Sequence, residues 1–108
     1  MNVCTNFKVA RLRSAKHMAF VGSLRCSVCP RANATQVHHL TCGPELKARG
    51  LKASDCWTVP LCHAHHDAQS MGSVHHAGDE TAWWNSKERD PIEIAATLWA
   101  MSLEAGRA

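Results

Sequence analysis

Residues 36–40 have the sequence QVHHL and residues 59–66 have the sequence VPLCHAHH, and these two stretches decide the fold. They hold five of the eight histidines in a chain of 108 residues. The first stretch predicts a short strand over residues 34–40. The second predicts a strand over residues 57–61, with Pro60 marking an edge or strand end, that continues into a helix. Folded together, they would place a structural and a catalytic metal site side by side.

The structural site is predicted from two short-spaced pairs. Cys62 and His65 stand three residues apart, which puts both side chains on one face of a helix over residues 62–70. Cys26 and Cys29 form a CxxC turn that brings two thiolates within reach of one ion. Three thiolates and one imidazole are a closed ligand set suited to structural zinc.

Two alternatives to this assignment stay open. His63 or His66 could replace His65 as the fourth ligand, although His63 is adjacent to Cys62 and points elsewhere on a helix. A CxxC pair is also a redox motif, but that motif is followed by a helix, and Pro30 blocks immediate helix continuation here.

The remaining histidines point to a second site. A metal site that cleaves phosphodiesters needs a few ligands with open positions, and a base near the attacking water. His38 and His39 can supply one ligand and one base, and His66 and one of His75 or His76 can add ligands. Consecutive strand residues point to opposite faces, so the HH pair shares a site only where the strand ends or bulges. Otherwise one of the pair is a ligand and the other lies on the surface.

Three further helices are expected. Residues 12–24 have apolar residues near a helical period, with His17 predicted as a surface or cap residue. Residues 78–85 form a short amphipathic helix. The sequence DPIE starts a C-terminal packing helix over residues 90–104, with an aspartate N-cap, a proline in the first turn and a capping-box glutamate.

A long loop over residues 41–55 carries Lys47, Arg49 and Lys52. These cations either form a solvated face or contact phosphates. A formal charge of +3 and a pI near 8.6 permit a nucleic-acid partner without demanding one.

The other cysteines show no metal spacing. Cys4 lies in an irregular N-terminal segment, residues 1–11, and is expected to be a free structural or exposed thiol. Cys42 and Cys56 are predicted to be buried or spare thiols. The sequence has no signal peptide and no apolar run long enough to span a bilayer, so we expect no membrane association and a cytoplasmic location where thiols stay reduced.

The order CxxC, HH and LCxxHH resembles the HNH endonuclease superfamily. The segments HMAFVGSLRCSVC, VHHLT, LKASDCWTVPLCHAHH, HHAGDETAWW and DPIEIAATLWA are similar to phage and prophage HNH proteins, including those akin to the RecA-dependent Ref nuclease. This resemblance covers about residues 13–103. It implies an α+β fold: a small ββα-metal (His-Me finger) core with structural zinc and flanking helices, in one domain over residues 1–108.

Carried over position by position, the resemblance implies four roles. His38 would be a ligand of a catalytic divalent metal, and His39 the general base that deprotonates water. His66 would be a second metal ligand. Asp55 stands near the position of a polar residue that orients the base.

The sequence departs from the family pattern at one point. Many relatives place another metal-binding histidine where this chain has Ser70. Residues 70–74 resemble a small insertion, after which His75 best matches the missing ligand, with His76 as its substitute. Glu80 is expected to be a helix residue rather than a ligand.

The resemblance thus predicts a metal-dependent DNA endonuclease that hydrolyses phosphodiester bonds. Its cofactors would be structural Zn²⁺ and catalytic Mg²⁺ or Mn²⁺, with Zn²⁺ or Ni²⁺ as alternatives. Its partners would be DNA and, in addition, a recombinase or other phage protein. Two rivals are a non-catalytic zinc module that binds nucleic acid or protein, and a thiol redox protein.

Overall fold

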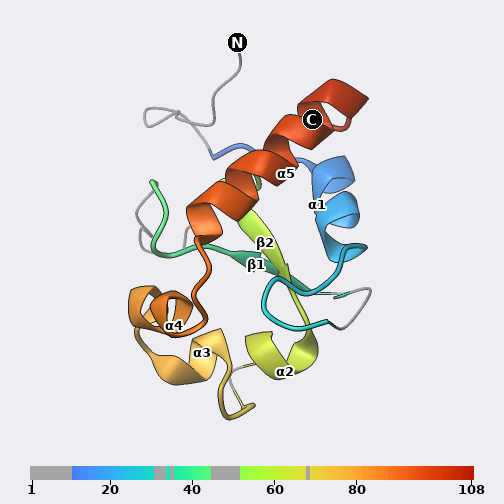
Figure 1. Ribbon diagram of the computed structural model, residues 1–108. Coiled ribbons are helices and arrows are strands. Elements are labelled where there is room, and N and C mark those ends of the chain that lie inside the picture. Colours follow the sequence, from blue (N-terminus) through green and yellow to red (C-terminus); the bar gives the residue numbers. More distant parts are fainter. Residues whose placement is uncertain (1–10, 31–33, 35, 45–51, 68) are drawn as a thin grey trace.

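The computed structural model describes residues 11–30, 34, 36–44, 52–67 and 69–108. The elements within these ranges are α1 (Ala15–Gly22), β1 (Gln36–His39), β2 (Thr58–Leu61), α2 (His63–His66), α3 (Val74–Ala77), α4 (Glu80–Ser86) and α5 (Pro91–Ala105). In Figure 1, α1 and α5 lie towards one end of the molecule and α2, α3 and α4 towards the other, with the strands between them. This is the predicted small α+β fold.

The two strands form an antiparallel sheet. Gln36 lies opposite Leu61, and His39 lies opposite Thr58. Each strand is shorter than predicted. All of β2 is buried, whereas only His38 is buried in β1. Because β2 leads directly into α2, this pairing sets the histidine pair of β1 beside the histidines of α2.

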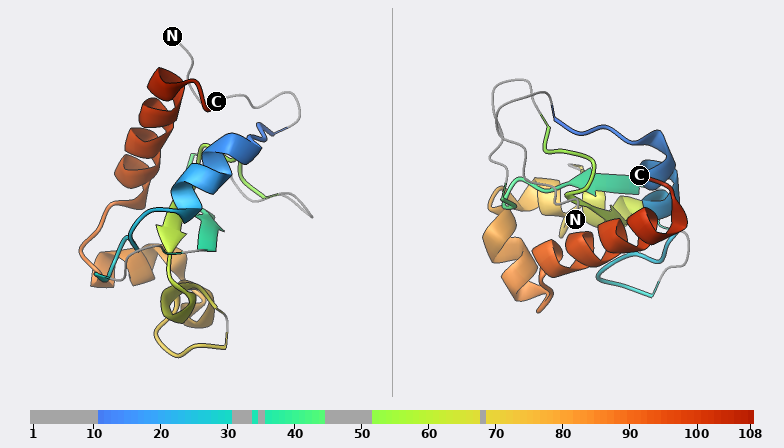
Figure 2. Two further views of the ribbon diagram at one scale, coloured as in Figure 1. Left: turned by 90° about the vertical axis from the view of Figure 1, so that its right-hand side faces the viewer. Right: turned by 90° about the horizontal axis from the view of Figure 1, so that it is seen from above.

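The core forms where α1 and α5 pack against β2, as the two views of Figure 2 show. Its fully buried members include Val21 from α1, Val59 and Leu61 from β2, and Ala95 from α5. Trp99 of α5 is 7% exposed and lies in one cluster with Val59, Leu61 and Ala95.

Helix α5 confirms the predicted C-terminal packing helix. The side chain of Asp90 accepts hydrogen bonds from the backbone N–H groups of Ile92 and Glu93, as an N-cap residue does. Gly106 ends the helix with a left-handed backbone, φ 75°. Within the described ranges, no helix is long and apolar enough to cross a membrane.

Helix α1 is shorter than predicted, and its histidine, His17, is buried. Ser14 is the N-cap, and its Oγ accepts a hydrogen bond from the backbone N–H of His17 at 3.2 Å. The prediction that His17 lies on the surface is wrong, because it is 0% exposed. Its Nδ1 lies 2.6 Å from Ser102 Oγ, and its ring meets Trp99 edge-on at 5.0 Å. Both contacts come from α5, which the sequence of α1 does not reveal.

The segment after β2 also differs from the prediction. The helix expected over residues 62–70 is shortened to α2, which stops at His66 because Asp67 adopts an extended backbone with φ −66° and ψ 131°. The predicted insertion leads into α3, capped by Ser73. Gly78, expected to begin the next helix, instead ends α3 with φ 80°, so α4 begins later than predicted.

The remaining cysteine predictions have mixed outcomes. Cys56 is buried as expected, with 1% exposed, but it is disulfide-bonded, so the prediction of a spare thiol is wrong. Spacing along the chain does not show which sulfurs the fold brings together. Cys42 is half-buried and free. Cys4 and the predicted irregular segment lie outside the described residues, apart from Arg11, which belongs to no helix or strand.

Candidate metal centres

Three thiols and one imidazole meet between the CxxC turn and α2. Cys26, Cys29, Cys62 and His65 each offer one donor atom, and these atoms all lie within 4.8 Å of one another. The Sγ atoms of Cys29 and Cys62 are 3.7 Å apart. His65 Nδ1 lies 3.2 Å from Cys62 Sγ and 3.9 Å from Cys26 Sγ. We call these four residues the Cys3His cluster.

The spacing of the Cys3His cluster fits a tetrahedral ion. Zinc–sulfur bonds of about 2.3 Å and zinc–nitrogen bonds of about 2.0–2.1 Å separate two sulfurs by about 3.8 Å, and a sulfur from a nitrogen by about 3.6 Å. The observed sulfur pair at 3.7 Å and sulfur–nitrogen pairs at 3.2 and 3.9 Å lie around these values. The cluster can therefore bind a metal such as zinc.

The CxxC turn is held against β2 through Ser27. Its backbone N–H and its Oγ both donate to the carbonyl oxygen of Pro60, at 2.9 and 2.8 Å. Burial raises the pKa of Cys26, but hydrogen bonds from the Val28 and Cys62 backbone and from Cys29 outweigh it and lower that pKa. A lowered pKa favours the thiolate, which is the form that binds metals.

The single turn of α2 divides its three histidines between different surroundings. His65 faces the Cys3His cluster, as predicted, whereas His63 is exposed and its Nε2 lies 3.0 Å from Asp67 Oδ2. His66 lies on the other side, among histidines from β1 and α3. The alternatives of His63 or His66 as the fourth ligand of the Cys3His cluster therefore do not match the geometry.

A second group, the histidine cluster, contains His38, His66 and His75. Their candidate donor nitrogens also lie within 4.8 Å of one another, and the Nε2 atoms of His66 and His75 are 3.2 Å apart. Two imidazole nitrogens on one tetrahedral ion, with bonds of about 2.0–2.1 Å, lie about 3.3 to 3.4 Å apart, close to this distance. His38 is 2% exposed, whereas His75 is exposed, so the cluster opens on one side.

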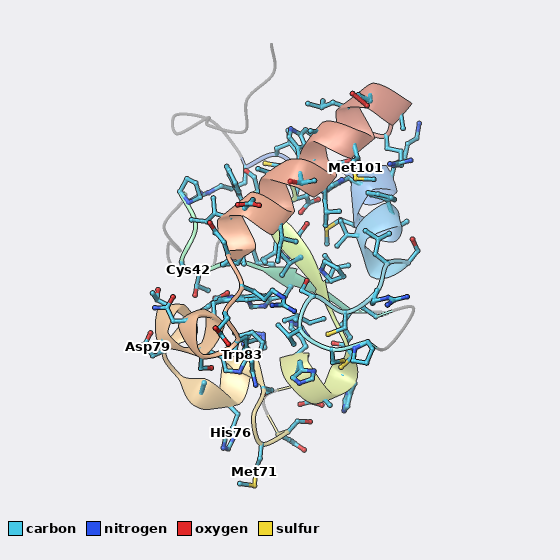
Figure 3. All side chains as sticks on the ribbon, viewed as in Figure 1. Cys42, Met71, His76, Asp79, Trp83 and Met101 are labelled. Carbon is cyan, nitrogen blue, oxygen red and sulfur yellow. The ribbon has the colours of Figure 1, made fainter. Side chains whose placement is uncertain are left out.

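Helix α3 decides between the two adjacent candidates for the third ligand. Ser73 Oγ accepts a hydrogen bond from the backbone N–H of His76 at 3.1 Å and so caps the helix. Trp83 Nε1 donates to the carbonyl oxygen of Gly72 at 2.9 Å, which ties the preceding loop to α4. This placement turns His75 to the cluster, whereas His76 is exposed and points away from the body of the molecule (Figure 3).

Two side chains that the sequence analysis did not assign to the site hold histidine rings of the cluster. Gln36 Oε1 lies 2.7 Å from His66 Nδ1. Glu80 Oε2 lies 2.8 Å from His38 Nε2. Glu80 is the first residue of α4, as expected for a helix residue, but its carboxylate reaches back to β1. No local pattern could have revealed either contact, because each joins residues at least 30 positions apart.

The second histidine of the HH pair, His39, contacts Asp55. It is the last residue of β1, and its Nε2 lies 2.9 Å from Asp55 Oδ1. The other Asp55 oxygen, Oδ2, accepts a hydrogen bond from the backbone N–H of Ser14 at 2.7 Å, and Arg13 Nη1 lies 3.4 Å from Oδ1. The carboxylate predicted to orient the base therefore contacts His39.

Both members of the HH pair line one pocket of about 240 Å³. The other lining residues include His66, His75 and the exposed Lys52. The exposed cation Lys52 thus lines the pocket that holds the histidine cluster. Lys47 and Arg49 lie outside the described residues.

Burial favours the uncharged form of two pocket imidazoles, His66 and His39. Burial, with smaller contributions from the neighbouring His38 and His75, lowers the pKa of His66 to about 4. Burial also lowers the pKa of His39, although Asp55 opposes the shift, and the charges of Lys52 and Arg13 act in the same direction as burial. Neutral imidazoles can bind a metal or accept a proton.

Fold and site together define a small α+β protein with a Cys3His cluster that can hold a metal and a separate histidine cluster beside it. The chain belongs to the protein family described as "Protein of unknown function (DUF968)", which matches residues 4–106. No curated protein and no solved structure matches the chain.

Proposed function

We propose that this protein is a metal-dependent DNA endonuclease of the HNH type, with a ββα-metal core and a structural zinc in the Cys3His cluster. The observation that carries the proposal is the convergence of His38, His66 and His75 in one pocket with His39. Three imidazoles in a cluster that opens on one side leave room for a phosphate and a water, as catalytic metal sites do.

His39 is the proposed general base. If its Nε2 donates to Asp55 Oδ1, then Nδ1 carries the lone pair that takes a proton from water. Burial lowers the pKa of His39, so the ring is neutral and ready to act as a base at neutral pH. Asp55 is held in turn by Ser14, which fixes the orientation of the pair.

The reaction is hydrolysis of a DNA phosphodiester. The histidine cluster would hold a divalent cation, Mg²⁺ or Mn²⁺, which would supply positive charge to stabilise the negative charge that develops during cleavage. The water oxygen forms a bond to phosphorus as the bond to the 3′ oxygen breaks. One water proton passes to His39 and the departing oxygen takes a proton from solvent, which leaves a 3′-hydroxyl and a 5′-phosphate.

Lys52 is the proposed phosphate contact among the described cations, because it lines the same pocket. Such contacts position the DNA backbone without reading its sequence. Binding should therefore weaken as salt rises, since bound phosphates release counterions.

Plasmid nicking by purified, zinc-loaded protein with Mg²⁺ or Mn²⁺ tests the proposal. We expect His39→Ala to lose about 10²- to 10⁴-fold in rate, the usual contribution of a general base, and to keep one zinc per chain. His63→Ala is the matched control, because His63 is exposed and pairs with Asp67 outside the pocket. Equal nicking by His39→Ala and wild type would contradict the assignment of the base.

A non-catalytic zinc module is the second candidate, because the Cys3His cluster is complete without any residue of the histidine cluster. It predicts salt-sensitive DNA or protein binding with one zinc per chain and no nicking with Mg²⁺, Mn²⁺, Zn²⁺ or Ni²⁺. A thiol redox protein is disfavoured, because Cys26 and Cys29 lie together with Cys62 and His65 in the Cys3His cluster.

A further inference from the structure

The carboxylate of Glu80 lies at the meeting point of β1, the segment after it and α4. Its side chain is only 7% exposed. Oε2 lies 2.8 Å from His38 Nε2 and accepts a hydrogen bond from Trp84 Nε1, also at 2.8 Å. Oε1 accepts hydrogen bonds from both the backbone N–H, at 3.0 Å, and the hydroxyl of Thr41. Each oxygen thus has two partners.

These partners keep Glu80 ionised. Trp84 Nε1 and the backbone N–H and hydroxyl of Thr41 all donate hydrogen bonds to it, and three donors around one carboxyl group favour its ionised form. An ionised carboxylate has no proton and can only accept hydrogen bonds. The nitrogen that faces it, His38 Nε2, must therefore carry the hydrogen.

This requirement decides which nitrogen of His38 can bind a metal. A neutral imidazole has one N–H and one lone pair, so a proton on Nε2 leaves the lone pair on Nδ1. Metal-binding histidines commonly donate their other N–H to a carboxylate, which fixes the ring and makes it a stronger ligand. Glu80 itself does not belong to the group of donor atoms within 4.8 Å that His38, His66 and His75 form.

We infer that Glu80 is a positioning residue for the histidine cluster, which holds His38 in the Nε2–H tautomer with Nδ1 as the metal-binding atom. The inference rests on the proposed function only in treating that cluster as a metal site. Glu80 thus links His38 on β1 to the helix pair α3–α4, which supplies His75. Through Glu80, α4 thereby fixes the orientation of His38 on β1.

The first test is made on the wild-type protein. Long-range ¹H–¹⁵N spectra of the zinc-loaded protein without a second metal report the protonation of each ring nitrogen. We expect His38 to show a protonated Nε2 and an unprotonated Nδ1. A protonated Nδ1 would overturn the inference, and this result does not depend on any variant folding.

The second test compares Glu80→Gln with Glu93→Gln by calorimetric titration of the zinc-loaded protein with Mn²⁺. The control makes the same change at an exposed first-turn residue of α5. We expect Glu80→Gln to weaken Mn²⁺ binding by about 10- to 100-fold, as loss of such a partner does, and to mix the His38 tautomers. The control should match wild type, and zinc content and melting curves establish that both variants fold.

Two outcomes separate this inference from the proposed function. A protein with the expected tautomer and the expected loss of Mn²⁺ affinity that never nicks DNA would refute the nuclease and leave the role of Glu80 standing. A nicking enzyme whose Mn²⁺ affinity and His38 tautomer are unchanged by Glu80→Gln would refute the role of Glu80. Complete loss of Mn²⁺ binding, with the His38 tautomer unchanged, would also refute it, because Glu80 would then be a direct ligand.

Discussion

Cys62→Ser is the sharpest perturbation of the Cys3His cluster. Cys62 is 2% exposed, and its sulfur lies between Cys29 Sγ at 3.7 Å and His65 Nδ1 at 3.2 Å. It also stands at the junction of β2 and α2, as the N-cap of the helix. The hydroxyl that replaces it is shorter and harder, and it does not ionise at neutral pH, so a tetrahedral zinc would lose one of four bonds.

The expected effect is large because the core is small. Structural zinc in small domains contributes about 10–16 kcal/mol of apparent binding free energy. The whole stability of a domain is about 5–15 kcal/mol. Loss of the zinc should therefore remove most of the folding free energy and abolish cooperative melting. Cys42→Ser is the matched control, since burial and the charge of Glu80 raise the pKa of Cys42 to about 11, which keeps that free thiol uncharged.

Zinc content and thermal melting by circular dichroism measure both effects. We expect one zinc per chain and a sharp transition for wild type and Cys42→Ser, with the control shifted by no more than about 4–8 °C, or 1 kcal/mol. Cys62→Ser, and wild type after chelation, should melt without cooperativity. A Cys62→Ser protein that retains stoichiometric zinc and the wild-type melting temperature would refute the assignment of the cluster.

Three further predictions concern other residues. His75→Ala should weaken Mn²⁺ binding to the zinc-loaded protein by at least tenfold while His76→Ala does not, and equal affinities by calorimetry would exclude His75 as a ligand. Asp55→Asn should slow nicking by about 10⁴-fold, as amide replacement does in the serine-protease triad, because it can turn the His39 ring to the wrong tautomer; a wild-type nicking rate would contradict this. Burial lowers the folded-state pKa of His17 below 6.5, so the unfolded chain binds a proton first as pH falls from 6.5 towards the folded value. Stability is therefore full above pH 6.5 and falls below it by up to about 1.4 kcal/mol per pH unit. His17→Gln should remove this slope in urea titrations, and a wild-type-minus-mutant difference that does not change with pH would show the reasoning to be wrong.

The features that the sequence predicted well are those set by short-range geometry. Cys62 and His65 are three residues apart, and one helical turn is enough to bring both side chains into the Cys3His cluster. The start of α5 at Asp90 is likewise local, because the cap involves only the next few backbone N–H groups. Such features do not depend on the exact length of an element. Cys62 and His65 still lie together although α2 is much shorter than predicted.

The features that the sequence did not predict depend on packing between distant elements. His17 shows the usual polar position on an amphipathic helix, but Ser102 and Trp99 of α5 enclose it. Glu80 reaches His38 across 42 positions because the fold brings the first residue of α4 to the buried histidine of β1. Neither contact can be predicted from residue spacing, because a carboxylate or hydroxyl from any distant element could occupy the same position beside the histidine.

The third histidine of the cluster shows how the end of a helix relocates a ligand. In the HNH pattern that the sequence resembles, the ligand lies four residues after His66, on the same helix face, where this chain has Ser70. Here α2 ends at Asp67, so a side chain at that position would no longer project beside His66. The chain turns instead, Ser73 starts α3, and the Nε2 of His75 arrives 3.2 Å from that of His66. Because His75 stands on its own short helix, its position depends on the loop before α3 and on α4. If the histidine cluster binds a metal, as proposed, its affinity would therefore depend on contacts that a single longer helix would not need.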